Sequence, residues 1–350
     1  MRKRVRLGKL ALLAFFLVAC GPAPTVNGGS TPSAANPSPT PTLQVGCSAS
    51  NRCLALVKLR GSDAYVVRDI TDIRNPKTVG GTPSIGGQPR FISGTEVSWA
   101  DVQLYRAPLA GSPKTVAANS GTPLGIWQFD WSPDGTTPIY AAYKQDETAD
   151  LHVVSGGVDR KVASMPGIPI EFGCENQECA DRIALHLAYS PDGQSISWAE
   201  NLKPAVRLWT AGGNNIPLGT DDADVPFMLV WSGSTLYFRD SKGIEAFSNG
   251  RLVSFLPGVN WIRPKASPAG GQIVYEARDA AGRAHTYLVD TKTAQVRDLG
   301  TDRAEPAFLT FRFIWFKSES TGKTYIYDLQ DGTESSSIIT AVYDAWPHAA

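Results

Sequence analysis

One turn sequence, Ser-Pro-Asp-Gly, recurs in this chain with the same surroundings. It occurs in Phe129–Ala142 (FDWSPDGTTPIYAA) and in Leu187–Ala199 (LAYSPDGQSISWA), each time between two short apolar stretches. Proline fixes φ for the second position of a type I turn, aspartate suits the third, and glycine accepts the positive φ that ends it. Two short strands joined by such a turn form a β-hairpin. Because one hairpin cannot bury its own apolar face, the repetition predicts hairpins assembled into a larger array.

The hairpin pattern recurs in weaker form along the chain. The complete turns are Ser132-Pro133-Asp134-Gly135 and Ser190-Pro191-Asp192-Gly193. Alignment on the turn gives six hairpins: Phe91–Ala100, Trp131–Ala142, Tyr189–Ala199, Trp231–Arg239, Ala266–Ala277 and Phe308–Phe316. Most are followed by a third strand-like stretch and a fourth, shorter one. Four strands per unit, repeated at about 40 residues, predict an all-β fold made of propeller blades.

The number of blades follows from the ends of the repeat region. Residues 52–80 supply three strand-like tracts, which fit strands two to four of a further blade. The segment Ala341–Trp346 remains after the last blade, and we expect it to pair with the N-terminal strands and close the ring. Seven blades over residues 47–350 give about 43 residues each, inside the usual range of about 40–45, whereas six would need about 51. We therefore predict a single seven-bladed β-propeller, with six blades as the alternative.

The N-terminus is typical of a bacterial lipoprotein. Basic residues precede the apolar run Leu10–Ala19, which is shorter than the roughly 20 residues of a membrane-spanning helix. The run ends in Leu-Val-Ala-Cys, which resembles the lipoprotein box and makes Cys20 the predicted lipidation site; the alternative is an ordinary signal peptide with a chance cysteine. Residues 21–46 hold six prolines and no charged residue, which predicts a flexible tether. The predicted order is a signal peptide (1–19), a lipidated cysteine with its tether (20–46) and the propeller (47–350).

The remaining cysteines fall into two local pairs. In an oxidising compartment we expect the disulfides Cys47–Cys53 and Cys174–Cys179. A four-cysteine zinc site is the alternative, although zinc ligand pairs more often sit two to four residues apart. The second pair lies in extra sequence between two repeats. This insertion is either a binding loop on one face of the propeller or a disulfide-linked loop without that role.

Charge and motifs argue against several functions. Without the five cations of the first 19 residues, 28 of the 33 Lys and Arg remain against 33 Asp and Glu, and no basic stretch follows. A nucleic-acid partner is therefore not expected. The chain contains no G-x-S-x-G, H-E-x-x-H, P-loop or G-x-G-x-x-G motif. We predict neither a catalytic residue nor a cofactor.

Three sets of residues are weaker candidates for a site. The histidines occupy different blade positions and are expected in packing roles rather than as metal ligands. Three aspartates could bind calcium, but they lack the spacing of a dedicated loop and are expected in a polar turn. Most of the nine tryptophans are expected in the core, and a few near blade starts could line the channel mouth as a platform for carbohydrate or peptide. These residues are His152, His186, His285 and His348; Asp221, Asp222 and Asp224; and Trp127, Trp261 and Trp346.

The two complete hairpins resemble the β-propeller repeat of the TolB family, which is related to WD-type repeats and to the propellers of prolyl oligopeptidases. The other four copies keep the hairpin pattern without the full Ser-Pro-Asp-Gly turn. The resemblance implies an extracytoplasmic or envelope propeller used mainly for protein contacts, and it assigns no reaction.

These features together predict an extracytoplasmic lipoprotein, anchored through Cys20 to a bacterial membrane, that binds a protein or peptide partner at the cell envelope without catalysis. The alternatives are a propeller hydrolase or lyase acting on polysaccharide, and a carbohydrate-binding propeller. Carboxylates or histidines converging at one mouth of the channel would favour an enzyme. An apolar or aromatic rim would favour a binding protein.

Overall fold

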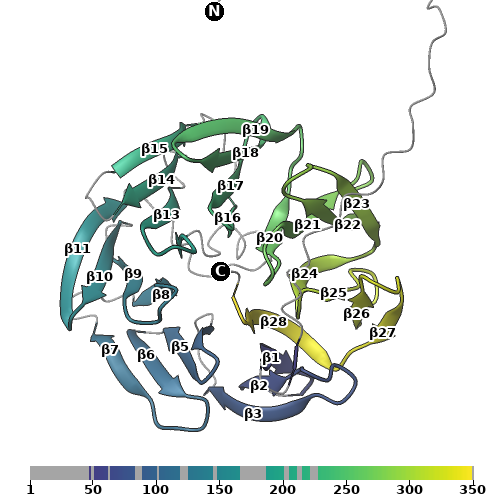
Figure 1. The fold of residues 1–350 in the computed structure, drawn as a ribbon, viewed down its shortest axis with the longest axis horizontal. Helices are drawn as coiled ribbons and strands as arrows, with labels where there is room; N and C mark the ends of the chain where they lie inside the picture. Colours follow the sequence, from purple (N-terminus) through teal and green to yellow (C-terminus); the bar gives the residue numbers. More distant parts are fainter. Residues whose placement is uncertain are drawn as a thin grey trace, which may run out of the picture. The chain divides into compact units, whose positions relative to one another are not determined.

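The computed structural model describes residues 47–48, 51–61, 64–82, 89–100, 102–118, 125–144, 148–165, 187–200, 205–210, 215–220 and 228–348. Within these residues, 28 strands form seven four-stranded antiparallel sheets, and there is no helix. The sheets stand around a common centre as the blades of a β-propeller (Figure 1). This confirms the predicted all-β fold and seven blades rather than six. No described segment is a helix long and apolar enough to span a bilayer.

The strands of each blade are given from the centre outward. Blade 1 contains β28 (Ile339–Trp346), β1 (Leu54–Leu59), β2 (Tyr65–Asp69) and β3 (Lys77–Thr82), and blade 2 contains β4 (Arg90–Ser93), β5 (Glu96–Ala100), β6 (Gln103–Pro108) and β7 (Lys114–Ala118). Blade 3 contains β8 (Ile126–Trp131), β9 (Pro138–Tyr143), β10 (Ala149–Ser155) and β11 (Val158–Met165), and blade 4 contains β12 (Ala188–Tyr189), β13 (Ser195–Glu200), β14 (Ala205–Thr210) and β15 (Asn215–Thr220). Blade 5 contains β16 (Leu229–Ser232), β17 (Thr235–Asp240), β18 (Gly243–Ser248) and β19 (Arg251–Pro257). Blade 6 contains β20 (Ile262–Ala266), β21 (Gln272–Arg278), β22 (Ala284–Asp290) and β23 (Val296–Thr301), and blade 7 contains β24 (Ala304–Phe308), β25 (Phe313–Lys317), β26 (Thr324–Asp328) and β27 (Glu334–Ser336).

The strand directions give the propeller two different ends. The turns that join the first strand of a blade to the second, and the third to the fourth, lie at one end, which we call the turn face. The connections from the second strand to the third, and from one blade to the next, lie at the opposite end, which we call the loop face. Because β1 is a second strand, the chain enters the propeller at the turn face.

The Ser-Pro-Asp-Gly turns join first and second strands, as predicted. In blade 3 the Ser132 hydroxyl donates to Asp134 Oδ1 at 2.6 Å, and the Thr137 N–H donates to Ser132 Oγ at 2.9 Å. The turn of blade 4 repeats both contacts between residues 190 and 195. The serine hydrogen bond, with others from Thr136, lowers the pKa of Asp134. The side chains of the motif therefore hold the turn in shape.

The turn glycines also set the spacing between blades. Gly135 and Gly193 have φ values of 68° and 71°, which favour glycine. A Cβ on Gly135 would lie 2.8 Å from Ile92 Cγ2 in the preceding blade, and one on Gly193 would lie 3.3 Å from Pro133 Cδ. The turns of successive blades thus pack against one another around the centre.

The ring closes through its two terminal strands. In the antiparallel pair β1–β28, Leu54 lies opposite Trp346 and Lys58 lies opposite Ala341, which confirms the predicted pairing. The Trp315 indole N–H of blade 7 donates to the Ile339 carbonyl at 3.0 Å. Blade 1 is therefore built from both ends of the propeller sequence and is hydrogen-bonded to blade 7.

Tryptophans fill much of the core, and one candidate for the channel mouth lies there too. Trp99, Trp131 and Trp198 are buried, whereas Trp231 is only half-buried. Trp261, a candidate for the channel mouth, is 0% exposed and donates its indole N–H to the Met228 carbonyl at 3.1 Å. The mouth-platform alternative is wrong for Trp261, because its ring is enclosed between blades 5 and 6.

The first cysteine pair is joined in the structure. Cys47 and Cys53 form a disulfide with an S–S distance of 2.06 Å, directly before β1. This bond fixes the start of the domain to the turn face. Cys20, Cys174 and Cys179 lie outside the described residues, so the lipidation site and the second disulfide stay predictions.

Candidate functional site

Two charged residues on innermost strands have a left-handed backbone. Arg263 in β20 has φ 51° and Glu305 in β24 has φ 56°, and each directly precedes a proline. The pairing of each strand with its neighbour shifts register at these positions, so both residues belong to β-bulges. Since such a conformation costs a non-glycine residue about 1–3 kcal/mol, strain of this kind often marks a functional position.

A buried carboxylate holds the two bulges together. Glu276 of β21 is 1% exposed, and its Oε2 accepts the Glu305 N–H at 2.9 Å and Arg263 Nη1 at 3.1 Å. Its Oε1 lies 3.3 Å from Arg278 Nη2. The bulge leaves the Glu305 N–H without a ladder partner, and Glu276 supplies one. The strained residues are therefore fixed by charge-assisted hydrogen bonds.

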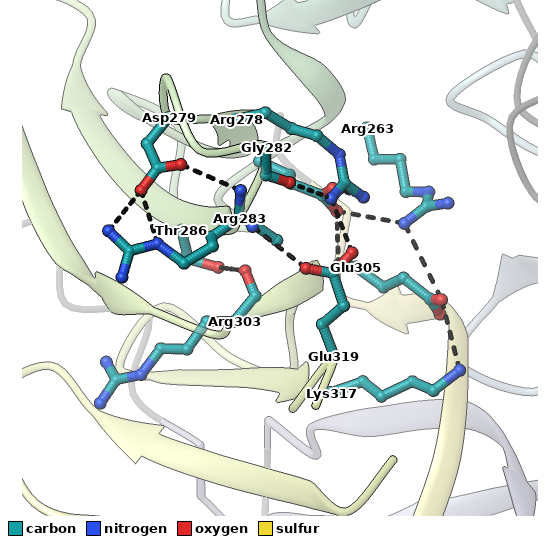
Figure 2. Close-up of polar contacts among 12 residues, drawn as sticks. Arg263, Arg278, Asp279, Gly282, Arg283, Thr286, Arg303, Glu305, Lys317 and Glu319 are labelled. Atoms are coloured by element: carbon teal, nitrogen blue, oxygen red, sulfur yellow. Dashed lines mark hydrogen bonds and ion pairs between the residues drawn. The ribbon is translucent and has the colours of Figure 1, made fainter. Parts of the chain in front are cut away.

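Further ion pairs extend this group toward solvent (Figure 2). Arg278 Nη1 lies 2.6 Å from Glu319 Oε1, and Glu305 Oε1 lies 3.6 Å from Lys317 Nζ. The side chains of Arg278, Lys317 and Glu319 are 44%, 41% and 40% exposed. We call the six residues the charged cluster: Arg263, Glu276, Arg278, Glu305, Lys317 and Glu319.

The charged cluster lies at the loop face, on and next to the innermost strands of the ring. Arg263 and Glu305 lie near the starts of innermost strands, and Lys317 lies at the end of β25. Blades 6 and 7 thus supply all six residues of the charged cluster.

The outer pair of the charged cluster is ionised at neutral pH. The hydrogen bond from Arg278 lowers the pKa of Glu319, and the hydrogen bond to Glu319 raises the pKa of Arg278. The exposed rim of the cluster therefore presents fixed charges of both signs. Such a surface favours partners with complementary charges and discriminates against others.

A second polar group clamps blades 1 to 4 nearer the turn face. Asp344 of β28 accepts the Phe91 N–H at 2.7 Å, and Asp130 of β8 accepts the Tyr189 N–H at 2.8 Å. The other Asp130 oxygen lies 2.6 Å from Arg90 Nη1. Each carboxylate thus joins its own innermost strand to that of an adjacent blade.

The C-terminal residues lie at the turn face, where β28 ends. His348 Nε2 is 2.9 Å from Asp344 Oδ2, and although burial opposes protonation, the aspartate charge raises the pKa of His348. Trp346 and Pro347 line a cavity of about 10 Å³ together with turn residues of blades 6 and 7. That volume holds about one water molecule, so this small cavity leaves no room for a larger ligand.

The predicted minor candidates do not converge on one site. His152 stacks on Tyr140 with Nδ1 2.8 Å from Asp159, and His285 lies in blade 6 beside two aspartates. Within the described residues, no group of three or more His, Cys, Asp or Glu could hold a metal ion. The side chain of Trp127, His186 and the three aspartates of the calcium alternative (Asp221, Asp222 and Asp224) fall outside the described parts.

Blade 3 carries a separate group of ion pairs near the loop face. These ion pairs predict that the folded protein loses stability in acid. Asp150 is 12% exposed and lies 2.8 Å from Lys144 Nζ and 2.9 Å from Lys161 Nζ. Burial works to raise the pKa of Asp150, but hydrogen bonds from Lys144, Lys161 and Ser164 outweigh it and lower the pKa to about 2.

Because this pKa is depressed on folding, the stabilisation is present above the unfolded value of about 3.9 and is lost as pH falls toward 2. Asp150→Asn is expected to cost about 1–2 kcal/mol at neutral pH after allowance for solvent screening. Urea unfolding of both proteins from neutral to acid pH measures this. The difference in free energy of unfolding between the two proteins should shrink toward zero near pH 2. A difference that persists there would contradict the assignment of these ion pairs.

The sequence holds a signal for the strained residues that the repeat alignment missed. Arg263-Pro264 and Glu305-Pro306 occupy the same position in successive repeats. A charged residue before proline at the start of two innermost strands is an unusual pattern, since proline restricts the residue before it. The partners of these residues come from other strands, so no local pattern identifies them.

Several solved structures share this architecture, whereas no family model and no curated protein matches the chain. TolB from Acinetobacter baumannii is 15% identical, with 84% of this chain and 81% of that chain covered and a TM-score of 0.48. An oligogalacturonate lyase in complex with manganese is 12% identical, with 81% and 83% covered and a TM-score of 0.52. A putative 6-phosphogluconolactonase from Bacteroides fragilis is 9% identical, with 85% and 98% covered and a TM-score of 0.53. At 12% and 9% identity, the likeness to the lyase and to the putative 6-phosphogluconolactonase shows a common fold and nothing more.

Proposed function

We propose that the protein is a membrane-anchored extracytoplasmic lipoprotein whose propeller binds a protein or peptide partner at the cell envelope without catalysis. The charged cluster is the observation that carries the binding proposal. It combines two strained bulges, a buried carboxylate that fixes them and an exposed rim of both charge signs. A rigid, charge-patterned surface of this kind suits specific recognition of a polar protein surface.

The attachment of the chain supports binding at the loop face. The disulfide at Cys47 and Cys53 lies at the turn face, so a lipid on Cys20 would be connected to that end. A flexible tether over residues 20–46 would have an r.m.s. reach of roughly 30 Å. The charged cluster lies at the opposite end of the propeller from this disulfide.

The clamps near the turn face support a non-catalytic role. Asp130 and Asp344 have a hydrogen-bond donor on every carboxylate oxygen, and each bridges two blades through a backbone N–H. A general base or nucleophile needs an oxygen that can reach substrate. Although these carboxylates gather with His348 at one end of the ring, as expected for an enzyme, we propose that they hold the blades together, because their oxygens already accept hydrogen bonds from the protein.

The anchor and the binding activity are tested separately. Cys20→Ala is expected to abolish incorporation of labelled lipid and to shift the protein out of the membrane fraction; unchanged labelling would refute the lipoprotein assignment.

For binding, a Lys317→Glu, Glu319→Lys exchange keeps the net charge and alters only exposed groups. Mild cross-linking in membranes, followed by purification, should recover an envelope protein with the wild type and not with the exchange variant. Equal melting temperatures of the wild type and the exchange variant are the control for intact folding. Equal recovery with both would contradict binding through the charged cluster.

A further inference from the structure

A cavity between blades 4 and 5 opens at the turn face. The charged cluster, in contrast, lies in blades 6 and 7 at the loop face. The cavity lies between the Ser-Pro-Asp-Gly turn of blade 4 and strands β16 and β18 of blade 5, and its volume is about 170 Å³. By the same measure, it has room for several waters or for one small ring compound. No residue of the charged cluster lines it, so its role is independent of the function proposed above.

The walls of the cavity are aromatic and firmly held. Trp231 and Phe247 line it and pack against the hydrophobic core between blades 4 and 5. The Trp231 indole N–H donates to Ser197 Oγ at 2.9 Å, which fixes the orientation of the ring. Both aromatic side chains are half-buried and therefore keep accessible ring surface.

The rim of the cavity carries polar groups without partners. Asp192 Oδ1 accepts hydrogen bonds from Ser190 and Gln194 within the turn, while its Oδ2 accepts none from the described residues. Across the cavity, the side chains of Ser234, Ser248 and Asn249 also make no hydrogen bond within the described parts of the chain. The rim thus offers one carboxylate oxygen, two hydroxyls and one amide to a ligand.

We propose that this cavity binds one neutral pyranose unit of a glycan. The apolar C–H face of a pyranose ring matches an aromatic wall, and its hydroxyls match a rim of mixed donors and acceptors. No Lys, Arg or His lines the cavity, and the single charge is negative, so phosphorylated and acidic sugars are disfavoured. An ammonium compound would use the carboxylate and the indole but would leave the two hydroxyls and the amide unmatched.

The test is saturation-transfer difference NMR of the folded protein with glucose, galactose, mannose and N-acetylglucosamine, with choline as the ammonium probe. At least one sugar should bind saturably with an affinity on the order of millimolar. Asp192→Asn keeps an acceptor for the turn and alters the free oxygen, and Asn249→Gly suits the φ of 52° and removes the amide. Each should weaken binding about three- to tenfold, as expected for one lost hydrogen bond.

The matched control is Asp134→Asn, which makes the same change in the equivalent turn of blade 3. This variant should bind the sugar as the wild type does. The proposal is overturned if no sugar binds saturably, if choline binds and the sugars do not, or if Asp192→Asn and Asn249→Gly bind as tightly as Asp134→Asn.

Discussion

Deletion of residues 341–350 is expected to unfold the propeller or to lower its melting temperature greatly. The deletion removes most of β28, which is the only partner of the inner edge of β1 in its sheet among the described strands. It also removes Trp346, which packs with the core of blades 1 and 2, and Tyr343, whose ring lies 4.7 Å from that of Tyr65. Burying one large aromatic side chain is worth roughly 1.5–3 kcal/mol, against a total stability of about 5–15 kcal/mol. The exposed edge of β1 should in addition promote aggregation.

Thermal unfolding followed by circular dichroism measures this effect. Deletion of the last two residues alone is the control and should leave the transition unchanged, because β28 ends at Trp346. A protein that lacks residues 341–350 and still melts at the wild-type temperature would show that the ring does not depend on its C-terminal strand.

Replacement of the buried Glu276 by alanine is expected to cost about 3–5 kcal/mol. The substitution leaves Arg263, whose side chain is 18% exposed, without its nearest carboxylate, and removes the acceptor of the Glu305 N–H. Breaking one side of a buried ion pair is costly, because the remaining charge stays desolvated. Glu276→Gln keeps an oxygen for the Glu305 N–H and should cost less than the alanine variant.

Equilibrium urea unfolding of the variants gives these free energies. Glu319→Gln is the matched control, since its ion pair with Arg278 is 40% exposed on the glutamate side and should contribute less than about 1 kcal/mol. If Glu276→Ala and Glu319→Gln lose equal amounts of stability, the buried carboxylate is not what fixes the two bulges.

Much of the fold could be predicted because its determinants are local and repeated. The Ser-Pro-Asp-Gly turns identify hairpins from four residues, and the hairpins occur at propeller spacing. Ring closure could also be predicted, since Ala341–Trp346 was the strand left over and the first blade lacked one. Each of these inferences needed only sequence order and the rule that strands avoid open edges.

The candidate site could not be predicted, because its contacts join residues that are far apart in sequence. Glu276 meets Arg263 and Glu305 only after three strands from two blades are assembled, and nothing near Glu276 distinguishes it from an exposed glutamate. The cavity at the turn face could not be predicted for the same reason. Its aromatic wall comes from blade 5 and its free carboxylate from the turn of blade 4, where Asp192 looks identical in sequence to Asp134.

The central proposal, that a protein partner binds at the loop face, is tested most directly by site-specific photo-cross-linking of the full chain in membranes of the producing cells. A photoreactive amino acid replaces the exposed Thr321 beside the charged cluster at the loop face or the exposed Thr136 at the turn face. We predict one adduct with an envelope protein from position 321, its loss on Lys317→Glu, and no such adduct from position 136. An adduct from position 136 alone, or an adduct from position 321 that survives Lys317→Glu, would contradict binding at the loop face.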